Sequence, residues 1–321
     1  MDDRRFDLLC VGEALVDFLP QERGRMRDVR HFAVTSGGAP ANVAIGAARL
    51  GASVAFSGVV GADEFGHFLE DSLEGEGIDC GGLRKSAAGK TGLSFIALDE
   101  RGERRFDFYG APSADMLLDL QDVDPARIAA SRIVHAGSNT LLLEPGVEAT
   151  RRFLALGRES GAVISLDPNL RLHRWREPDR LRLLLDELCA GADVVKIAAE
   201  EAAFVTGAEA PGEAARELVR RGVGLAVVTR GAAGAVWARA GDEGAVAAPQ
   251  VALVDATGAG DGFMAALLVR IAEELRGGVR PEGIPVERLR AHLGFAARVG
   301  AAVVQHLGAV AGLPRAGAPL P

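Results

Sequence analysis

The 321-residue sequence has few residues that could form disulfides or bind zinc. Its three cysteines, Cys10, Cys80 and Cys189, are odd in number and far apart, so a disulfide framework and a C-x-x-C motif are both excluded. Its six histidines show neither HxxxH nor HExxH spacing, which excludes the common zinc-hydrolase motifs. This cysteine usage is typical of a reducing compartment, and we expect a cytoplasmic protein.

Long apolar runs and clusters of positive charge are also missing. No stretch approaches the roughly 18 apolar residues of a membrane-spanning helix. Lys and Arg total 36 against 44 for Asp and Glu, a formal net charge of −8 at pH 7. A chain of this charge without a basic run is not expected to bind nucleic acid or a membrane surface. With 48% hydrophobic residues, the composition predicts a compact, soluble globular protein.

Short apolar runs alternate with amphipathic stretches from one end of the chain to the other. This alternation predicts an α/β fold, with a mostly parallel sheet sandwiched by helices. The expected strands are residues 6–12, 53–60, 132–136, 162–167, 193–197 and 225–229. The expected helices are residues 41–50, 63–75, 147–159, 179–189, 213–221, 261–275 and 286–307.

Two regions depart from this alternation. Residues 14–35 and 91–110 contain short segments of period 2, the second around a turn at 99–102, and we expect them to form a small β lid outside the main sheet. Without an internal repeat or a low-complexity linker, a single domain over residues 1–321 is favoured, ending in a Gly/Pro/Ala tail at 312–321. The exposed edges of such a lid predict a homodimer formed through it.

A glycine-rich turn precedes a long apolar helix. We expect a strand at 251–254, the turn at 258–260 and the helix at 261–275. Small residues in the turn let backbone N–H groups converge at the positive end of the helix, which is how a protein binds phosphate without a lysine. Asp261 then lies in the first helical turn. It is either an ordinary helix cap or a general base for a hydroxyl that attacks the bound phosphate.

Two other phosphate-binding motifs are excluded. Gly89-Lys90-Thr91 ends like a P-loop, but Arg84 stands where that motif requires a glycine. A dinucleotide-binding GxGxxG would need a third glycine where Phe263 stands.

A second group of small residues, 36–51, opens a helix near the amino terminus. Asn42 lies in the first turn of that helix, either as a cap or as a ligand-binding residue. Glu13 and Asp17 follow the first expected strand, at the carboxyl edge where open α/β sheets usually bind ligands.

Taken in chain order, these segments and several others resemble the signature regions of the ribokinase-type (PfkB) carbohydrate kinases. The resemblance is strongest to the fructokinase branch. The likeness runs from Gly12 to about Pro314 and is carried by residues 12–18, 37–50, 61–66, 108–118, 167–171 and 255–261. The resemblance implies a sheet of about nine strands, a β lid that closes over a sugar, and ATP across the carboxyl edge of the sheet. It also implies Mg²⁺ and K⁺ as cofactors.

The resemblance further implies roles for individual residues. Asp261 would be the catalytic base. The anion hole would be formed by Gly258, Ala259 and Gly260. The sugar would be bound by Asp17, Gly38, Asn42, Tyr109 and Arg171. The nucleotide would be bound by Thr229, Gly231 and Gly234, with Glu201 organising Mg²⁺ through water. The monovalent cation would be bound by Asp255 and the carbonyl of Thr257.

Two of these residues also have ordinary structural interpretations, and three other positions depart from the family pattern. Arg171 is otherwise a surface residue, and Glu201 part of a solvated helix face. Ala198 and Ala297 replace residues that contact the nucleotide in many relatives, so the nucleotide preference is less determined than the chemistry. Gly110 stands where fructokinases and ketodeoxygluconate kinases usually have Arg. Its lack of a guanidinium favours a neutral sugar over an acidic one.

We therefore predict an ATP-dependent kinase for a small neutral sugar, with fructose, converted to fructose 6-phosphate, as the favoured acceptor. The same chemistry on 2-keto-3-deoxygluconate, ribose or a nucleoside is one alternative. A sugar or nucleotide sensor that has lost the chemistry is another, and the intact segment from Gly258 to Asp261 argues against it.

Overall fold

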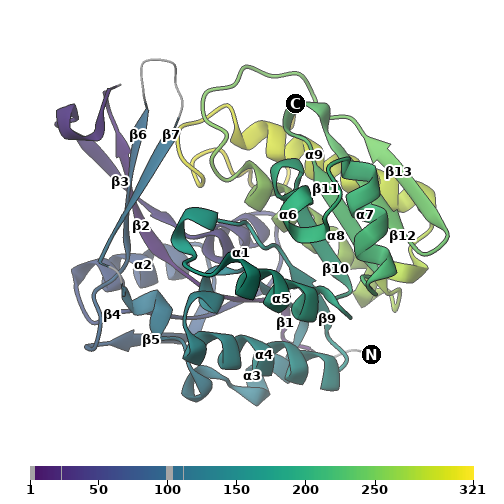
Figure 1. Cartoon of the computed structure of the whole chain (residues 1–321), viewed down its shortest axis with the longest axis horizontal. Coiled ribbons are helices and arrows are strands. Elements are labelled where there is room, and N and C mark those ends of the chain that lie inside the picture. Colours follow the sequence, from purple (N-terminus) through teal and green to yellow (C-terminus); the bar gives the residue numbers. More distant parts are fainter. Residues whose placement is uncertain (1–3, 23, 99–103, 111) are drawn as a thin grey trace.

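A nine-stranded sheet forms the centre of the molecule (Figure 1). The computed structural model describes residues 4–22, 24–98, 104–110 and 112–321. The strand order is β13-β12-β11-β10-β9-β8-β1-β4-β5. Their bounds are β1 (Phe6–Val11), β4 (Val54–Gly61), β5 (Asp79–Ser86), β8 (Ser131–Ala136), β9 (Val163–Leu166), β10 (Val194–Ala198), β11 (Leu225–Thr229), β12 (Ala235–Arg239) and β13 (Asp242–Val246). Neighbouring strands are parallel except at β11–β12 and β12–β13, so the expected mostly parallel sheet is confirmed.

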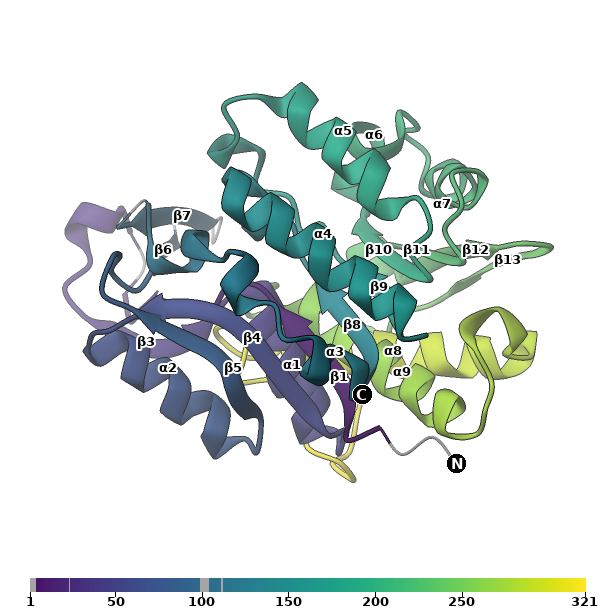
Figure 2. The same ribbon diagram turned by 90° about the horizontal axis from the view of Figure 1, so that it is seen from below.

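Helices cover both faces of this sheet (Figure 2). One layer comprises α1 (Ala39–Arg49), α2 (Glu64–Gly75), α8 (Ala259–Arg276) and α9 (Val286–Val303). The other comprises α3 (Pro125–Ala129), α4 (Glu144–Glu159), α5 (Pro178–Cys189), α6 (Ala202–Thr206) and α7 (Pro211–Arg220). Alternate residues of β1 enter the two cores: Leu8 packs with the first layer and Leu9 with the second. Burial on both faces explains why the strands are apolar throughout instead of alternating.

A second sheet of four strands, in the order β3-β2-β6-β7, stands beside the main body at the upper left of Figure 1. It is built from β2 (Leu15–Pro20), β3 (Phe32–Gly37), β6 (Leu93–Leu98) and β7 (Arg104–Tyr109). Both hairpins, β2–β3 and β6–β7, are antiparallel, and β2 joins β6 in parallel. The small second sheet expected from residues 14–35 and 91–110 is present, while the turn expected at 99–102 lies outside the described residues.

Residues 251–254 do not form the expected strand. The backbone amides of Val254 and Asp255 both donate to the carbonyl of Val304, at 2.8 and 3.1 Å. The segment therefore pairs with the end of α9 instead of a strand, and it leaves the side chains of Leu253 and Val254 exposed.

The carboxyl-terminal tail packs against the body of the protein. Leu313 is buried, and its carbonyl accepts a hydrogen bond from the guanidinium of Arg49 at 3.1 Å. The amide of Ala316 donates to the carbonyl of Arg49 at 2.7 Å. These contacts fix the tail to the end of α1.

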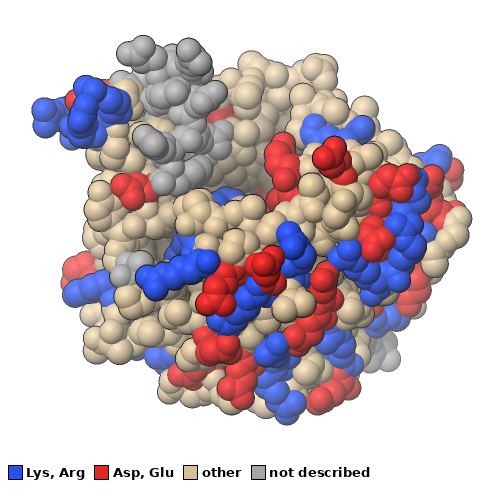
Figure 3. Space-filling view, in the orientation of Figure 1, with Lys and Arg blue, Asp and Glu red and all other residues tan. Residues whose placement is uncertain are grey.

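Charges of both signs are interspersed over the face that carries α5 and α7 (Figure 3). Many form ion pairs between elements, such as Arg221 with Asp186 at 2.6 Å and Arg151 with Glu187 at 2.5 Å. This face therefore presents no continuous basic surface. No helix among the described residues is both long and apolar enough to cross a membrane.

Candidate active site

A cavity of about 570 Å³ lies at the carboxyl edge of the main sheet, where the small sheet faces it. Its walls come from the loops after β1, β8, β9 and β10, the first turns of α1 and α8, and the small sheet. Most of the polar residues expected at the site line it: Asp17, Gly38, Asn42, Arg171, Glu201, Thr229, Gly231, Thr257 and Asp261. Residues separated by more than 200 positions thus meet in one cavity.

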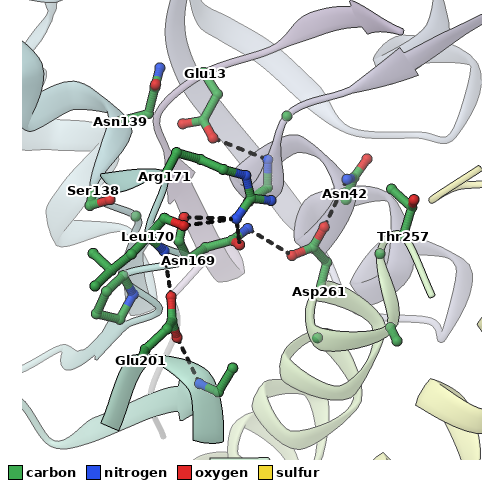
Figure 4. Close-up of a pocket in the computed structure, with 18 of the residues that line it drawn as sticks. Glu13, Asn42, Ser138, Asn139, Asn169, Leu170, Arg171, Glu201, Thr257 and Asp261 are labelled. Atoms are coloured by element: carbon green, nitrogen blue, oxygen red, sulfur yellow. Dashed lines mark hydrogen bonds between the residues drawn. The ribbon is translucent and has the colours of Figure 1, made fainter. Parts of the chain in front are cut away.

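Asp261 is a buried acid of the cavity that lies between two asparagines (Figure 4). It is 6% exposed, and its Oδ2 accepts a hydrogen bond from Asn42 Nδ2 at 2.8 Å. Asn169 Nδ2 lies 3.5 Å from the other oxygen. The cap residue of α8 is Gly258, and the cap of α1 is Gly38. The helix-cap alternatives for Asp261 and Asn42 are therefore wrong, because both side chains point at each other across the cavity.

Burial, and to a lesser extent the nearby carboxylate of Asp167, raise the pKa of Asp261 to about 6. The hydrogen bond from Asn42 and the charges of Lys196 and Arg171 oppose this increase. A carboxylate with a pKa near 6 is ionised at neutral pH and remains a stronger base than a solvated aspartate. Asp261 is therefore suited to accept a proton from a hydroxyl.

Asn169 was not among the expected site residues, although it lies in the 167–171 motif. It has a φ of 44°, and it is the one residue other than glycine with a positive φ in the part of the chain that the structure describes. Such backbone strain is typical of functional sites. Here it turns the amide of Asn169 toward Asp261. The arginine two residues later supports the turn, because Arg171 donates to Asn169 Oδ1 at 2.8 Å.

The expected anion hole lies at the amino terminus of α8. Gly258 has a φ of 76°, in the left-handed region that favours glycine, and the 18-residue helix begins at Ala259. Its N–H groups and its dipole give this end a partial positive charge beside the Asp261 carboxylate. A side chain at residue 258 would approach the Cα of Ala309 to 2.6 Å. The backbone behind the turn therefore excludes larger residues at this position, whether or not a phosphate is bound.

The end of the cavity that is lined by Glu13 and Asp17 is acidic and buried. Burial raises the pKa of Asp17 to about 7 and that of Glu13 to about 7. Glu13 Oε1 accepts from the amide of Ala39 at 3.2 Å. Glu13 Oε2 and Asn42 Oδ1 are buried without a hydrogen-bond partner among the described residues, so both can accept from ligand hydroxyls. The sequence placed Glu13 at this edge together with Asp17, but only Asp17 was assigned a role there.

Tyr109 does not lie where the resemblance implies. It is 52% exposed, and its ring meets that of Phe95 at 5.1 Å. Its neighbour Phe108 lines the cavity instead. Successive residues of a strand point to opposite faces, so the one-residue difference removes Tyr109 from the cavity wall.

A second, more apolar cavity of about 260 Å³ adjoins the first. The two share Thr229, Gly231, Ala256, Ala259 and Gly260. Gly234 also lines the second cavity, as do the apolar residues Val251, Phe263 and Ala297. Thr229, Gly231 and Gly234 are therefore brought together at the second cavity, and Glu201 lines the first.

Glu201 and Asp255 are held by backbone amides. Glu201 accepts from the amides of Leu170 and Ala198, the latter at 2.7 Å, and burial raises its pKa. Asp255 is 2% exposed, and it accepts from the amides of Thr257 and Gly308, both at 2.8 Å. Among the described residues, no three His, Cys, Asp or Glu side chains form a metal-binding group. A metal here would depend on single carboxylates, backbone carbonyls, water and the ligand itself.

The site combines a carboxylate base with an anion hole beside it, and two cavities adjoin there. This arrangement is typical of a phosphotransferase that acts on a hydroxyl. The chain belongs to the pfkB family of carbohydrate kinases, whose sequence model matches residues 5–316. This confirms the resemblance seen in the sequence, and with it the prediction of a sugar kinase.

Similar proteins extend over almost the whole chain. A probable chloroplastic fructokinase of Arabidopsis thaliana is 40% identical over 310 residues, which cover 96% of this chain and 79% of the relative. The crystal structure of a Xylella fastidiosa fructokinase with bound ATP superimposes with a TM-score of 0.85 at 34% identity, covering 96% of this chain and 94% of that one. A double mutant of the Vibrio cholerae fructokinase, with fructose, ADP and potassium bound, gives 0.85 at 33% identity, covering 97% and 96%.

The pKa of Asp261 predicts the pH dependence of the reaction. Because the base must be ionised, kcat/KM for the sugar should be lost as the pH falls through about 6. Asp17 titrates in the same cavity, so the measured value belongs to the two acids together. A pH–rate profile at saturating Mg-ATP checks this, and an acid limb near pH 4 would contradict it.

Proposed function

We propose that the protein transfers the γ-phosphoryl group of ATP to the terminal hydroxyl of fructose, giving fructose 6-phosphate and ADP. The observation that carries the proposal is the position of the Asp261 carboxylate, between the buried acceptors at the sugar end and the anion hole at the start of α8. The fructokinases among the similar proteins support fructose as the acceptor.

The charges at the sugar end favour a neutral polyol. Arg174 lines this end, but its guanidinium donates to Asn139 and lies 4.6 Å from the ring centre of Phe108. Glu13 and Asp115 carry the opposing negative charge beside it. Gly110 is exposed and provides no cation. A carboxylate on the sugar would therefore meet acids as well as arginines, whereas hydroxyls would satisfy the unpaired oxygens of Glu13 and Asn42.

A sugar panel tests this proposal. ADP release is measured with fructose, 2-keto-3-deoxygluconate, ribose and adenosine at saturating Mg-ATP. We expect kcat/KM to be highest for fructose, with product phosphorylated at the terminal carbon by NMR. A higher value for any other acceptor would reassign the substrate. ATP binding without transfer to any of them would make the protein a sensor.

Glu201 and Asp255 offer separate candidate sites for Mg²⁺ and K⁺. Glu201 lines the first cavity and is fixed by two amides, so it is suited to order water around Mg²⁺ on the nucleotide. Mg²⁺ would neutralise phosphate charge during transfer. Asp255, with the Thr257 carbonyl, offers hard oxygen ligands that suit K⁺ behind the turn. The hydrogen bond from Gly308 places the carboxylate between that turn and the residues after α9.

Potassium is expected to accelerate turnover. A cation beside Asp255 would hold the 255–258 turn in the conformation that forms the anion hole. Replacing K⁺ by tetramethylammonium at constant ionic strength should lower kcat/KM for ATP by about fivefold or more. Equal rates in the two salts would remove the cation from the mechanism.

A second copy of the chain is the partner that suits the small sheet. Val34 and Tyr109 are 46% and 52% exposed, on the edge strands β3 and β7. Phe18 and Phe95 stack beside them with ring centres 4.4 Å apart. Pairing of two small sheets would cover these groups and satisfy the strand edges. We expect a dimer by sedimentation at micromolar concentration, and Val34→Glu should shift it toward monomer. A wild-type monomer under these conditions would contradict the assignment.

A further inference from the structure

A buried lysine lies beside the anion hole and has no role in the mechanism given above. Lys196, on β10, is 4% exposed, and its Nζ lies 2.7 Å from Asp167 Oδ2 at the end of β9. Burial alone would lower its pKa, but the carboxylates of Asp167 and Glu201 raise the pKa above the ordinary value, so the ammonium is charged. A buried ion pair is weak evidence for stability, because apolar residues of similar size often serve as well.

The position of the ammonium relative to α8 suggests what the charge does. A Cβ built on Gly260 would lie 2.7 Å from Lys196 Nζ. Gly260 has an ordinary helical backbone, so conformational freedom does not explain a glycine there. A side chain at residue 260 would meet the ammonium, which is the flexible end of the lysine. The lysine thus faces the first turn of α8, whose N–H groups form the anion hole.

Lys196 is also open to the cavity. It is one of the lining residues, together with Gly258, Ala259 and Gly260. An ammonium has three N–H donors, and Lys196 forms a single ion pair among the described residues, with Asp167, so donors are left for a ligand. Arg171, by comparison, donates through one nitrogen to the carbonyls of Asn169 and Leu170 and to Asn169 Oδ1. The ammonium of Lys196 therefore lies beside the helix turn where the phosphoryl group would bind.

We infer that Lys196 is a further catalytic residue that binds the transferred phosphoryl group and stabilises its charge, with Asp167 holding the ammonium in place. This rests on the sugar kinase activity proposed above. In the reaction, the sugar oxygen bonds to the γ-phosphorus, and its proton passes to Asp261. The bond from that phosphorus to the β–γ bridging oxygen breaks, and its electron pair stays on ADP. Lys196 keeps its protons throughout and contributes only its charge and N–H donors.

The test compares Lys196→Met with the double variant Lys196→Met/Asp167→Asn, which removes the unpaired buried acid. Melting temperature, kcat, sugar KM and the affinities for ADP and a non-hydrolysable ATP analogue are measured for each. In both variants kcat should fall by about tenfold or more, with sugar KM within about threefold. Affinity for the ATP analogue should fall about tenfold more than affinity for ADP, because only the former carries the γ-phosphoryl group.

Lys85→Met is the matched control, since Lys85 pairs with Glu70 on the surface, away from the cavity. It should keep wild-type kcat and both affinities. Recovery of kcat in the double variant would show that Lys196 only neutralises Asp167, and an equal loss of ADP and analogue affinity would show a structural role. Either result overturns the inference. If Lys196→Met does not fold, the double variant alone decides. Failure of the wild type to phosphorylate any sugar would instead contradict the proposed function, whereas the nucleotide affinities test Lys196 independently.

Discussion

Replacing Asp261 by Asn should lower turnover by about 10²- to 10⁴-fold while the protein stays folded, because general-base help of that size is lost. The substitution keeps the size of the side chain, and an amide can still pair with Asn42, 2.8 Å away in the native protein. Removing a buried acid whose pKa is raised also relieves the cost of burying its charge. Turnover, sugar affinity and melting temperature are the measurements.

A true helix cap provides the control for this variant. Asp124 caps α3 by accepting from the amides of Ala126 and Arg127. Asp124→Asn should therefore change stability slightly and leave turnover unaltered. If Asp261→Asn stays within a few-fold of wild type, the base must be another carboxylate of the cavity, and Asp17 is the next candidate.

The sequence predicted the elements whose formation depends on local patterning. The strand at 225–229 is found with the expected bounds, because a buried parallel strand reads as an uninterrupted apolar run. The antiparallel strands β12 and β13 were not predicted. β13 is half exposed and contains Gly244 and Asp242, which strands usually lack. Only pairing with β12 makes this segment a strand.

The sequence predicted which residues form the site better than it predicted the contacts between them. Motifs identified Asn42 and Asp261, but a sequence does not show that side chains 219 positions apart share a hydrogen bond. For the same reason the sequence did not single out Lys196. In the sequence it only interrupts an apolar strand, and its proposed role depends on its positions beside Asp167 and Gly260. Tyr109 shows a different limitation. Which face of a strand a residue occupies depends on pairing register, and here Phe108 pairs with Ser94 and faces the cavity with it.

Gly258→Ala should lower turnover by about 10²-fold, the effect of losing one donor of an anion hole. An alanine at a φ of 76° is strained by about 1–2 kcal/mol. Its Cβ would also lie 2.6 Å from the Cα of Ala309, so the turn must move away from that backbone. Moving the turn displaces the N–H groups at the start of α8, while Asp17 and Asn42 stay in place. Sugar affinity should therefore change little, and kcat should carry the loss.

Gly241→Ala separates the cost of backbone strain from the displacement of the N–H groups at the start of α8. Gly241 has a φ of 83°, close to that of Gly258, but a Cβ there would meet nothing within 4 Å, in the turn between β12 and β13. It should lower the melting temperature through backbone strain alone and leave turnover at the wild-type value. If Gly258→Ala also retains wild-type turnover, the N–H groups of this turn do not bind the phosphoryl group. Its glycine would then be required only by the close approach of Ala309.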